Sequence, residues 1–150
     1  MIEVILKLDK SSRARLSWIQ SFAASFGIVP KPIYGHISLG SIPDEDLIAY
    51  KESMKGQAVF SVDMDRIDIL PNAPVIAAMA VKSDALEEIH RTVTADGNWI
   101  PCVELLRDSV MNLSWVRTAM AGMFQPFSAQ IERIEFMKDG TCVDAVDLPE

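Results

Sequence analysis

The alternation of apolar and polar positions along the chain predicts strands separated by helices. Strict alternation or a short apolar run is typical of a strand, whereas apolar residues three and four positions apart are typical of a helix. These patterns predict strands at Ile2–Leu8, Tyr34–Gly40, Phe60–Asp65, Val75–Val81, Trp99–Leu106, Ser128–Met137 and Thr141–Leu148. They predict helices over residues 12–26, 41–55, 83–93 and 108–123.

Local signals mark where these elements begin and end. Ser11 or Ser12 would cap the first helix, and Gly27 would end it. Ser41, followed by a proline and three acidic residues, has the composition of a helix amino terminus. Asp139-Gly140 predicts a hairpin turn between the last two strands. The three tryptophans, Trp18, Trp99 and Trp115, are candidates for the core.

The order of the elements repeats along the chain. Each half contributes a strand, a helix, a short alternating strand preceded by a proline-containing loop, and another helix. No linker-like segment separates the halves, so we expect a single domain over residues 1–150. The expected fold is α+β, with two pseudo-symmetric lobes around a central cleft. Each lobe would be an antiparallel sheet with helices packed outside, and the two alternating strands would be central.

Composition and charge limit the classes of partner. The 150 residues are 49% hydrophobic and carry a formal net charge of −7, which excludes a disordered chain and disfavours broad nucleic-acid binding. Cys102 and Cys142 have neither metal-type nor redox-type spacing. No signal peptide or membrane-length apolar run is visible, so we expect a cytoplasmic protein with reduced thiols. The sequence predicts no metal, no cofactor and no membrane partner, and it leaves the oligomeric state open.

Two side chains on the second predicted strand form the main candidate for chemistry. His36 and Ser38 lie two positions apart, so both leave the same face of a strand and bring an acid/base group beside a hydroxyl. Gly35 and Gly40 on either side would let another group approach the backbone. The other histidine, His90, lies near the carboxyl end of the third helix, and we assign it a structural role.

The element order, together with His36-Ile37-Ser38-Leu39, resembles the two-histidine phosphoesterase superfamily, which includes RNA 2′,5′-ligase-like and cyclic nucleotide phosphodiesterase proteins. The resemblance covers nearly the full chain. It implies a pair of His-x-Thr/Ser motifs that face each other across a cleft and act on a 2′,3′-cyclic or related phosphodiester. One histidine would be the general base and the other the general acid, and the hydroxyls would hold the phosphate oxygens. His36 and Ser38 match the first motif.

The second motif departs from the family pattern. It should fall in Trp99-Ile100-Pro101-Cys102-Val103-Glu104-Leu105, where Cys102 takes the place of the histidine and Glu104 takes the place of the hydroxyl residue. A carboxylate beside a phosphate places like charges a few ångströms apart, which costs on the order of a few kcal/mol. Arg107 would offset Glu104 by pairing with it, and Tyr34, Trp99 and Arg107 are candidates for lining the cleft.

Three hypotheses follow for the function. In the first, the protein is catalytically impaired and keeps the cleft as a binding site for a small phosphorylated ligand, a nucleotide or an RNA end. In the second, it is an active phosphodiesterase or RNA-end hydrolase that uses His36 with Glu104 or Cys102 as the partner group. In the third, a Cys102 thiolate beside His36 carries out a different, nucleophilic reaction. Plain packing is the alternative for Cys102, because free cysteine behaves as a small buried hydrophobe.

Overall fold

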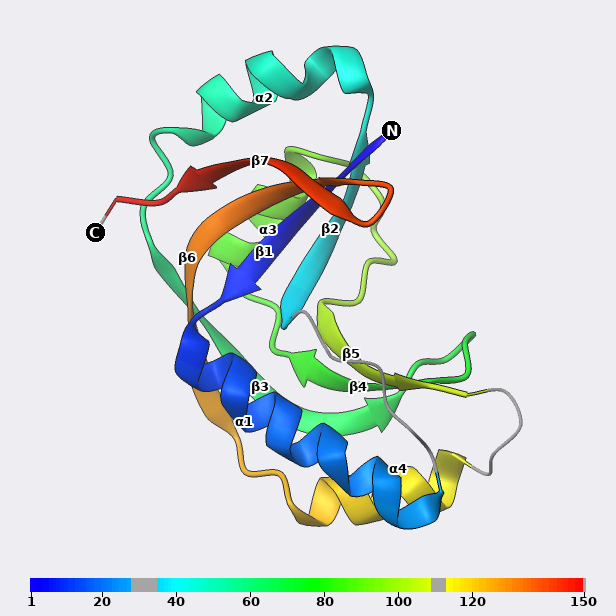
Figure 1. Cartoon of the computed structure of the whole chain (residues 1–150). Helices are drawn as coiled ribbons and strands as arrows, with labels where there is room; N and C mark the ends of the chain where they lie inside the picture. Colours follow the sequence, from blue (N-terminus) through cyan, green and yellow to red (C-terminus); the bar gives the residue numbers. More distant parts are fainter. Residues whose placement is uncertain (28–34, 109–112, 150) are drawn as a thin grey trace.

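A computed structural model describes residues 1–27, 35–108 and 113–149. Figure 1 shows the elements of this part of the chain. In chain order they are β1 Ile2–Leu8, α1 Lys10–Gln20, the 3-10 helix η1 Ser21–Phe26, β2 His36–Ile42, the 3-10 helix η2 Asp44–Asp46, α2 Leu47–Met54, β3 Phe60–Ile69, β4 Val75–Ala80, α3 Asp84–Arg91, β5 Cys102–Arg107, α4 Leu113–Gly122, β6 Phe127–Lys138 and β7 Thr141–Asp147.

Several boundaries differ from the predicted ones. Asp9, rather than Ser11 or Ser12, caps α1: its carboxylate accepts hydrogen bonds from Ser12 N at 3.3 Å and Ser12 Oγ at 2.6 Å. Gly27 ends η1 with a φ of 78°, as its place in the sequence predicts. Ser41 belongs to β2 and does not begin a helix. Its backbone pairs with Glu3 of β1, so pairing in the sheet outweighs its capping tendency.

The strands form one antiparallel sheet, so the α+β class is confirmed. The order is β2-β1-β6-β3-β4-β5, and β7 pairs with the upper part of β6. The long strand β6 pairs with β1 and β3, and it thereby joins the two separate sheets that the sequence suggests. The expectation that the two alternating strands are central is wrong, because β2 and β5 lie at the two ends of this order. The sheet curves, and β2 and β5 contact each other.

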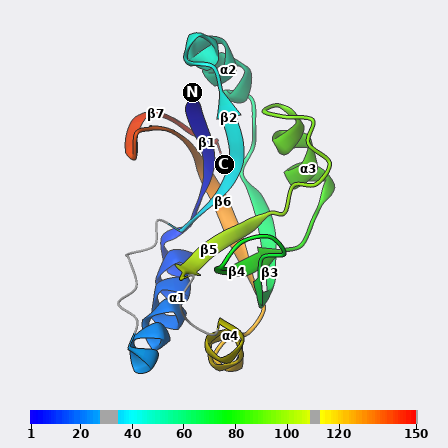
Figure 2. The same ribbon diagram turned by 90° about the vertical axis from the view of Figure 1, so that its right-hand side faces the viewer.

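Helices of each half of the chain pack against strands of the other half. In the first half of the chain, α1 packs against β5 and β6, and the buried Gln20 Nε2 donates a 2.7 Å hydrogen bond to Leu105 O of β5. In the second half, α3 packs against β2. Figure 2 shows α1 and α4 together at one end of the molecule and α2 at the other. Each half therefore covers part of the other, and the sheet and helices form one body.

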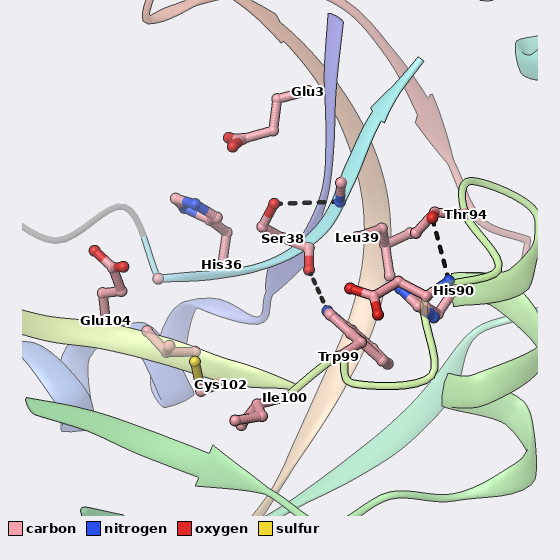
Figure 3. A pocket seen from close by; sticks show the side chains of 14 residues that line it. Glu3, His36, Ser38, Leu39, His90, Thr94, Trp99, Ile100, Cys102 and Glu104 are labelled. Atoms are coloured by element: carbon pink, nitrogen blue, oxygen red, sulfur yellow. Dashed lines mark hydrogen bonds between the residues drawn. The ribbon is translucent and has the colours of Figure 1, made fainter. Parts of the chain in front are cut away.

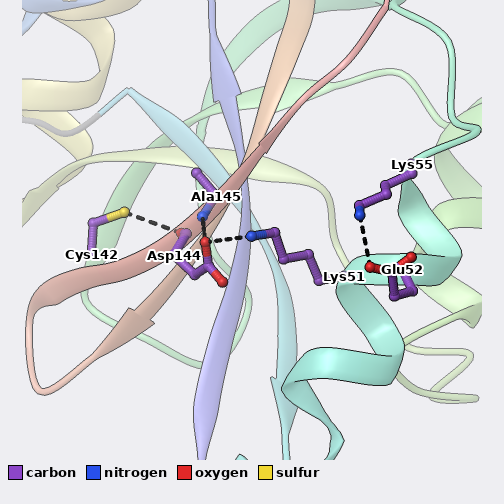
Figure 4. Close-up of polar contacts among 6 residues, drawn as sticks. All are labelled: Lys51, Glu52, Lys55, Cys142, Asp144 and Ala145. Atoms are coloured by element: carbon purple, nitrogen blue, oxygen red, sulfur yellow. Dashed lines mark hydrogen bonds and ion pairs between the residues drawn. The ribbon is translucent and has the colours of Figure 1, made fainter.

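Helix α2 is held to the sheet mainly at β7. Lys51 Nζ donates to Asp144 Oδ1 at 2.9 Å, and the same oxygen accepts a bond from Ala145 N at 2.8 Å (Figure 4). These two hydrogen bonds lower the pKa of Asp144. Glu52 and Lys55 pair on the outer side of the helix.

The core lies between the sheet and its helices. It is built from fully buried aliphatic and aromatic side chains, among them Leu6, Leu16, Ile37, Met120 and Phe136. Trp18 and Trp115 do not belong to it: they are 54% and 71% exposed, because α1 and α4 bury other faces. None of the helices in the described residues is long and apolar enough to cross a membrane.

Candidate functional site

The register between β1 and β2 sets the direction of the first motif. Lys7 pairs with His36 and Ile5 pairs with Ser38, so the side chains of His36 and Ser38 leave the same face of the sheet. A register shift between Val4 and Ile5 interrupts the pairing just beyond Ser38. The motif therefore lies on the last regular stretch of the strand before this irregularity.

Gly35 fixes the backbone immediately before His36. Its φ is +72°, and a Cβ at this position would lie 2.3 Å from Cγ of Arg13. Arg13 itself donates through Nε to Leu8 O at 3.0 Å, and Leu8 N donates to Gly35 O at 3.1 Å. Only glycine combines this conformation with so close a neighbour. The start of α1 and the end of β1 thus hold the entry to His36.

The second motif is positioned by β4. Met79 pairs with Cys102 and Ala77 pairs with Glu104, so these two side chains also share one face. Cys102 packs against a small apolar cluster of Val75, Ala77 and Met79. Glu104 is held by another residue of β5, because Arg107 Nη2 donates a hydrogen bond to its Oε1 at 3.0 Å.

The two motifs face a common cavity of about 420 Å³. Figure 3 shows His36 and Ser38 on β2 across from Cys102 and Glu104 on β5. All four side chains line the cavity, and Trp99 lines it as well. Arg107 is not among the lining residues and reaches the site only through its ion pair with Glu104. Tyr34, the remaining candidate, lies outside the described residues.

Trp99 links β2 to the segment that leads into β5. Its indole Nε1 donates to Ser38 O at 3.0 Å. Its ring stacks on the imidazole of His90, with centroids 4.0 Å apart and an interplanar angle of 2°. The wall that Trp99 forms is therefore attached to the first motif by a hydrogen bond and to α3 by a stacked ring.

The cavity contains groups that the sequence interpretation missed. Glu3, His90, Thr94 and Asp96 also line it. His90 is 4% exposed and belongs to the cavity wall. Helical spacing from Leu86 was the signal that could have placed His90 inward, since residues four apart share a face. Glu3 had a comparable signal, because it alternates with buried residues on β1.

Burial and neighbouring charges set the protonation of the site. Burial lowers the pKa of His36 below 6.5, against the opposing effect of Glu3, Glu104 and Glu135. The imidazole is therefore mostly neutral at pH 7. Burial, and then the charge of Glu104, raise the pKa of the Cys102 thiol to about 11. Cys102 thus stays protonated at neutral pH, which is contrary to what the thiolate hypothesis requires.

In the described segments, no group of three or more His, Cys, Asp and Glu side chains is arranged to hold a metal ion.

Comparison with known proteins gives a structural likeness without a sequence match. No protein-family profile and no curated protein matches the chain. TT0787 of Thermus thermophilus is 19% identical, with a TM-score of 0.66, and the match covers 98% of this chain and 97% of that one. E. coli LigT complexed with 3′-AMP is 17% identical, with a TM-score of 0.64 and coverage of 99% and 97%. A further solved structure, of a phosphoesterase, is 14% identical, with a TM-score of 0.63 and coverage of 99% and 98%. These likenesses extend over the whole fold.

Proposed function

Because the chain has the fold of the two-histidine phosphoesterases, we propose that it is a ligand-binding protein of this fold with impaired phosphodiester catalysis. One observation carries the proposal. Cys102 and Glu104 line the cavity together with His36 and Ser38, at the positions where the family resemblance predicts a histidine and a hydroxyl residue.

Cys102 is a poor substitute for a catalytic histidine. Transfer at a phosphodiester needs a proton acceptor at one end of the reaction axis and a proton donor at the other, each contributing about 10²- to 10⁴-fold. An acid/base group works best when its pKa lies near the working pH. The pKa of Cys102, raised to about 11, lies far from neutrality. Its packing against Val75 and Met79 is better suited to a structural side chain.

Glu104 is a poor substitute for a phosphate-binding hydroxyl. An ionised carboxylate accepts hydrogen bonds and cannot donate one to a phosphate oxygen. Its Oε1 is already taken by Arg107, whose Nη2 lies 3.0 Å away. On the opposite side, Ser38 Oγ accepts a 3.4 Å bond from Gly40 N and keeps its own hydrogen for a ligand. The cavity therefore has one complete motif, which suits binding, and one that does not support the reaction.

The cavity is large enough for a small molecule, since ligand sites commonly measure about 300–1,000 Å³ and this one measures about 420 Å³. The sequence predicts a small phosphorylated ligand, a nucleotide or an RNA end. E. coli LigT has been solved with 3′-AMP, phosphate, NADP+ and ATP. These ligands are the natural first probes for this chain.

A second candidate function is an active phosphodiesterase or RNA-end hydrolase. It is favoured by the position of Glu104, which lines the same cavity as His36 and acts on its pKa. In that mechanism, the Glu104 carboxylate would accept the proton of the attacking group and protonated His36 would donate to the leaving group.

Hydrolysis of 2′,3′-cyclic nucleotides by the full chain separates the two functions. We expect no turnover above that of a His36→Ala variant purified in parallel, which controls for contaminating enzymes. Thermal-shift measurements with nucleotides, on wild type and His36→Ala, report binding in the same preparations. Robust turnover that is lost in both His36→Ala and Glu104→Gln would contradict the proposal and establish the second candidate.

A further inference from the structure

The charges around the cavity point to the class of ligand. Three carboxylates line it, from Glu3, Asp96 and Glu104, and the described lining residues include no lysine or arginine. Among the described residues, Glu104 is the one of the three that is paired with a cation, Arg107. Within the described part of the chain, Asp96 accepts a bond from Asn98 N at 2.9 Å but has no ion pair, and Glu3 has none either. The lining is thus strongly acidic.

The two histidines do not compensate for this charge. Burial lowers the pKa of both His36 and His90, so both rings are mostly uncharged at pH 7. Glu3 and Glu104 lie near enough to His36 to act on its titration. A doubly charged phosphate at the first motif would therefore be placed beside two carboxylates. Like charges at such short range weaken binding.

An independent observation at His90 points the same way. The residue is only 4% exposed, and its Nε2 has no hydrogen-bond partner in the described structure. Asp96 and Glu87 on one hand, and Lys82 and Arg91 on the other, are the charged groups that act on it. Neutral imidazole has two tautomers, and the one protonated at Nδ1 offers Nε2 as an acceptor. In that tautomer a ligand N–H group would satisfy Nε2, and a phosphate oxygen would not.

The aromatic wall adds a third compatible group. The indole of Trp99 lines the cavity between the Ser38 carbonyl and the His90 ring (Figure 3). Organic cations are bound in proteins by carboxylates and by the faces of aromatic rings, and tryptophan is the strongest aromatic partner. The lining therefore combines acceptors, negative charge and an indole.

From these groups we infer that the cavity binds a small organic cation that carries N–H donors, such as a primary amine or a guanidinium compound. Glu3 and Glu104 accept from it beside His36, and Asp96 and His90 accept from it beside Trp99. This inference rests on the proposed function, because it assigns a ligand to the same cleft. It replaces the phosphorylated ligand that the sequence predicts with a ligand of opposite charge.

Agmatine is a suitable probe because it carries a guanidinium group at one end and an amine at the other. Binding of agmatine and of AMP to the full chain is measured by calorimetry and thermal shift at equal ionic strength. We expect agmatine to bind and AMP to bind at least tenfold more weakly. Glu3→Gln and Glu104→Gln should each weaken agmatine binding by about tenfold, since each removes one charge. Glu45→Gln removes an exposed carboxylate that does not line the cavity, and it should have no effect.

His90→Phe tests the buried acceptor separately. Phenylalanine keeps an aromatic ring against Trp99 but removes Nε2, so agmatine binding should weaken while the stability of the free protein is measured in parallel. An unchanged affinity in this variant, together with unchanged affinities in Glu3→Gln and Glu104→Gln, overturns the inference.

The failures of the two proposals are distinguishable. Binding of AMP that depends on His36, without binding of agmatine, overturns the cationic ligand and leaves the binding cleft intact. Absence of binding by agmatine up to millimolar concentration also overturns it. Turnover of 2′,3′-cyclic nucleotides that depends on His36 overturns the impaired catalysis, and agmatine binding that depends on Glu3 and Glu104 would then still support the cationic ligand.

Discussion

The two sides of the cavity have the same backbone geometry and different chemistry. On the end strand β2, the side chains of His36 and Ser38 point to the same face. Those of Cys102 and Glu104 do the same on β5, the strand at the other end of the sheet order. One side offers an acid/base group and a hydroxyl, while the other offers a protonated thiol and a carboxylate paired with Arg107. A fold can therefore preserve the direction of two pairs of side chains without preserving what they can do.

The surroundings of the two sides differ as well. The β2 side is fixed by tight contacts, namely Gly35 against Arg13 and the Ser38 carbonyl bonded to Trp99. The β5 side rests on small and flexible neighbours, Ala77 and Met79 of β4. Substitutions on β5 are therefore expected to be tolerated better than substitutions at Gly35, and the comparison can be tested from the β5 side.

The largest effect is expected from giving β5 the histidine and the hydroxyl residue that the family resemblance predicts there. The double substitution Cys102→His and Glu104→Thr supplies a second acid/base group and removes the carboxylate. We expect turnover of 2′,3′-cyclic nucleotides to rise by at least about 100-fold over wild type, the lower range for one acid/base group. Adding His36→Ala to the double variant should abolish the gain. A folded double variant without turnover would mean that the two sides differ by more than these two positions.

A second test measures the protonation of the β5 side directly. Cys142→Ser leaves Cys102 as the single thiol. The pKa of Cys102 is raised from 9.0 to about 11, so its thiolate fraction near pH 7.5 falls by about 100-fold. Alkylation by iodoacetamide should be slower than that of free cysteine by about this factor, and His36→Ala should not change the rate. Rapid alkylation that slows without His36 would revive the thiolate hypothesis.

The smallest effect concerns the pH dependence of stability. Burial lowers the folded-state pKa of His36 and His90 from 6.5, so the unfolded chain binds more protons as the pH falls through and below 6.5. Stability should be constant above about pH 7 and should decrease toward pH 5, by at most about 1.4 kcal/mol per pH unit for each histidine. Urea unfolding at pH 7.5, 6.5 and 5.5 measures the slope.

Single variants test whether the two histidines cause this pH dependence of stability. His36→Ala and His90→Phe should each reduce it, whereas Glu45→Gln should leave it unchanged. A carboxylate such as Asp9 does not interfere: hydrogen bonds from Ser12, Gln130 and Ser11 outweigh the effect of burial and lower its pKa to about 2, so its own contribution is lost only in stronger acid. A slope that neither histidine variant changes would contradict the neutral state of both rings.

How well each feature could be predicted from the sequence depends on how far apart in the chain its interacting residues lie. Strand Ile2–Leu8 and the alternation of His36 and Ser38 depend on neighbours within a few residues, and both are observed. The predicted cap of α1 is wrong because Asp9 also accepts a 2.9 Å bond from Gln130 N, which no local pattern reveals. The joining of the sheet by β6 and the packing of α1 on β5 are contacts of the same long-range kind.

The same distinction holds at the site. His36 and Ser38 could be singled out from a local pattern on a strand, whereas Cys102 and Glu104 were singled out only through the family resemblance. Glu3 and Asp96 enter the cavity from β1 and from the segment before Trp99, so their shared effect on its charge depends on the tertiary fold. The pairing of Glu104 with Arg107 was predicted from their nearness in sequence, but residues three apart on a regular strand point to opposite faces. The register shift between β4 and β5 brings these two side chains to one face.

Both strands that carry the motifs are also ends of the sheet. An end strand exposes unpaired backbone groups that can recruit another chain and start aggregation. Here β2 and β5 contact each other, and the Trp99 indole occupies the Ser38 carbonyl, so one acceptor on the β2 edge is already used. The contact between β2 and β5 that forms the cleft thus also covers part of both edges. Shielding of these two strand edges would therefore favour this closure whether or not the cleft acts on a substrate.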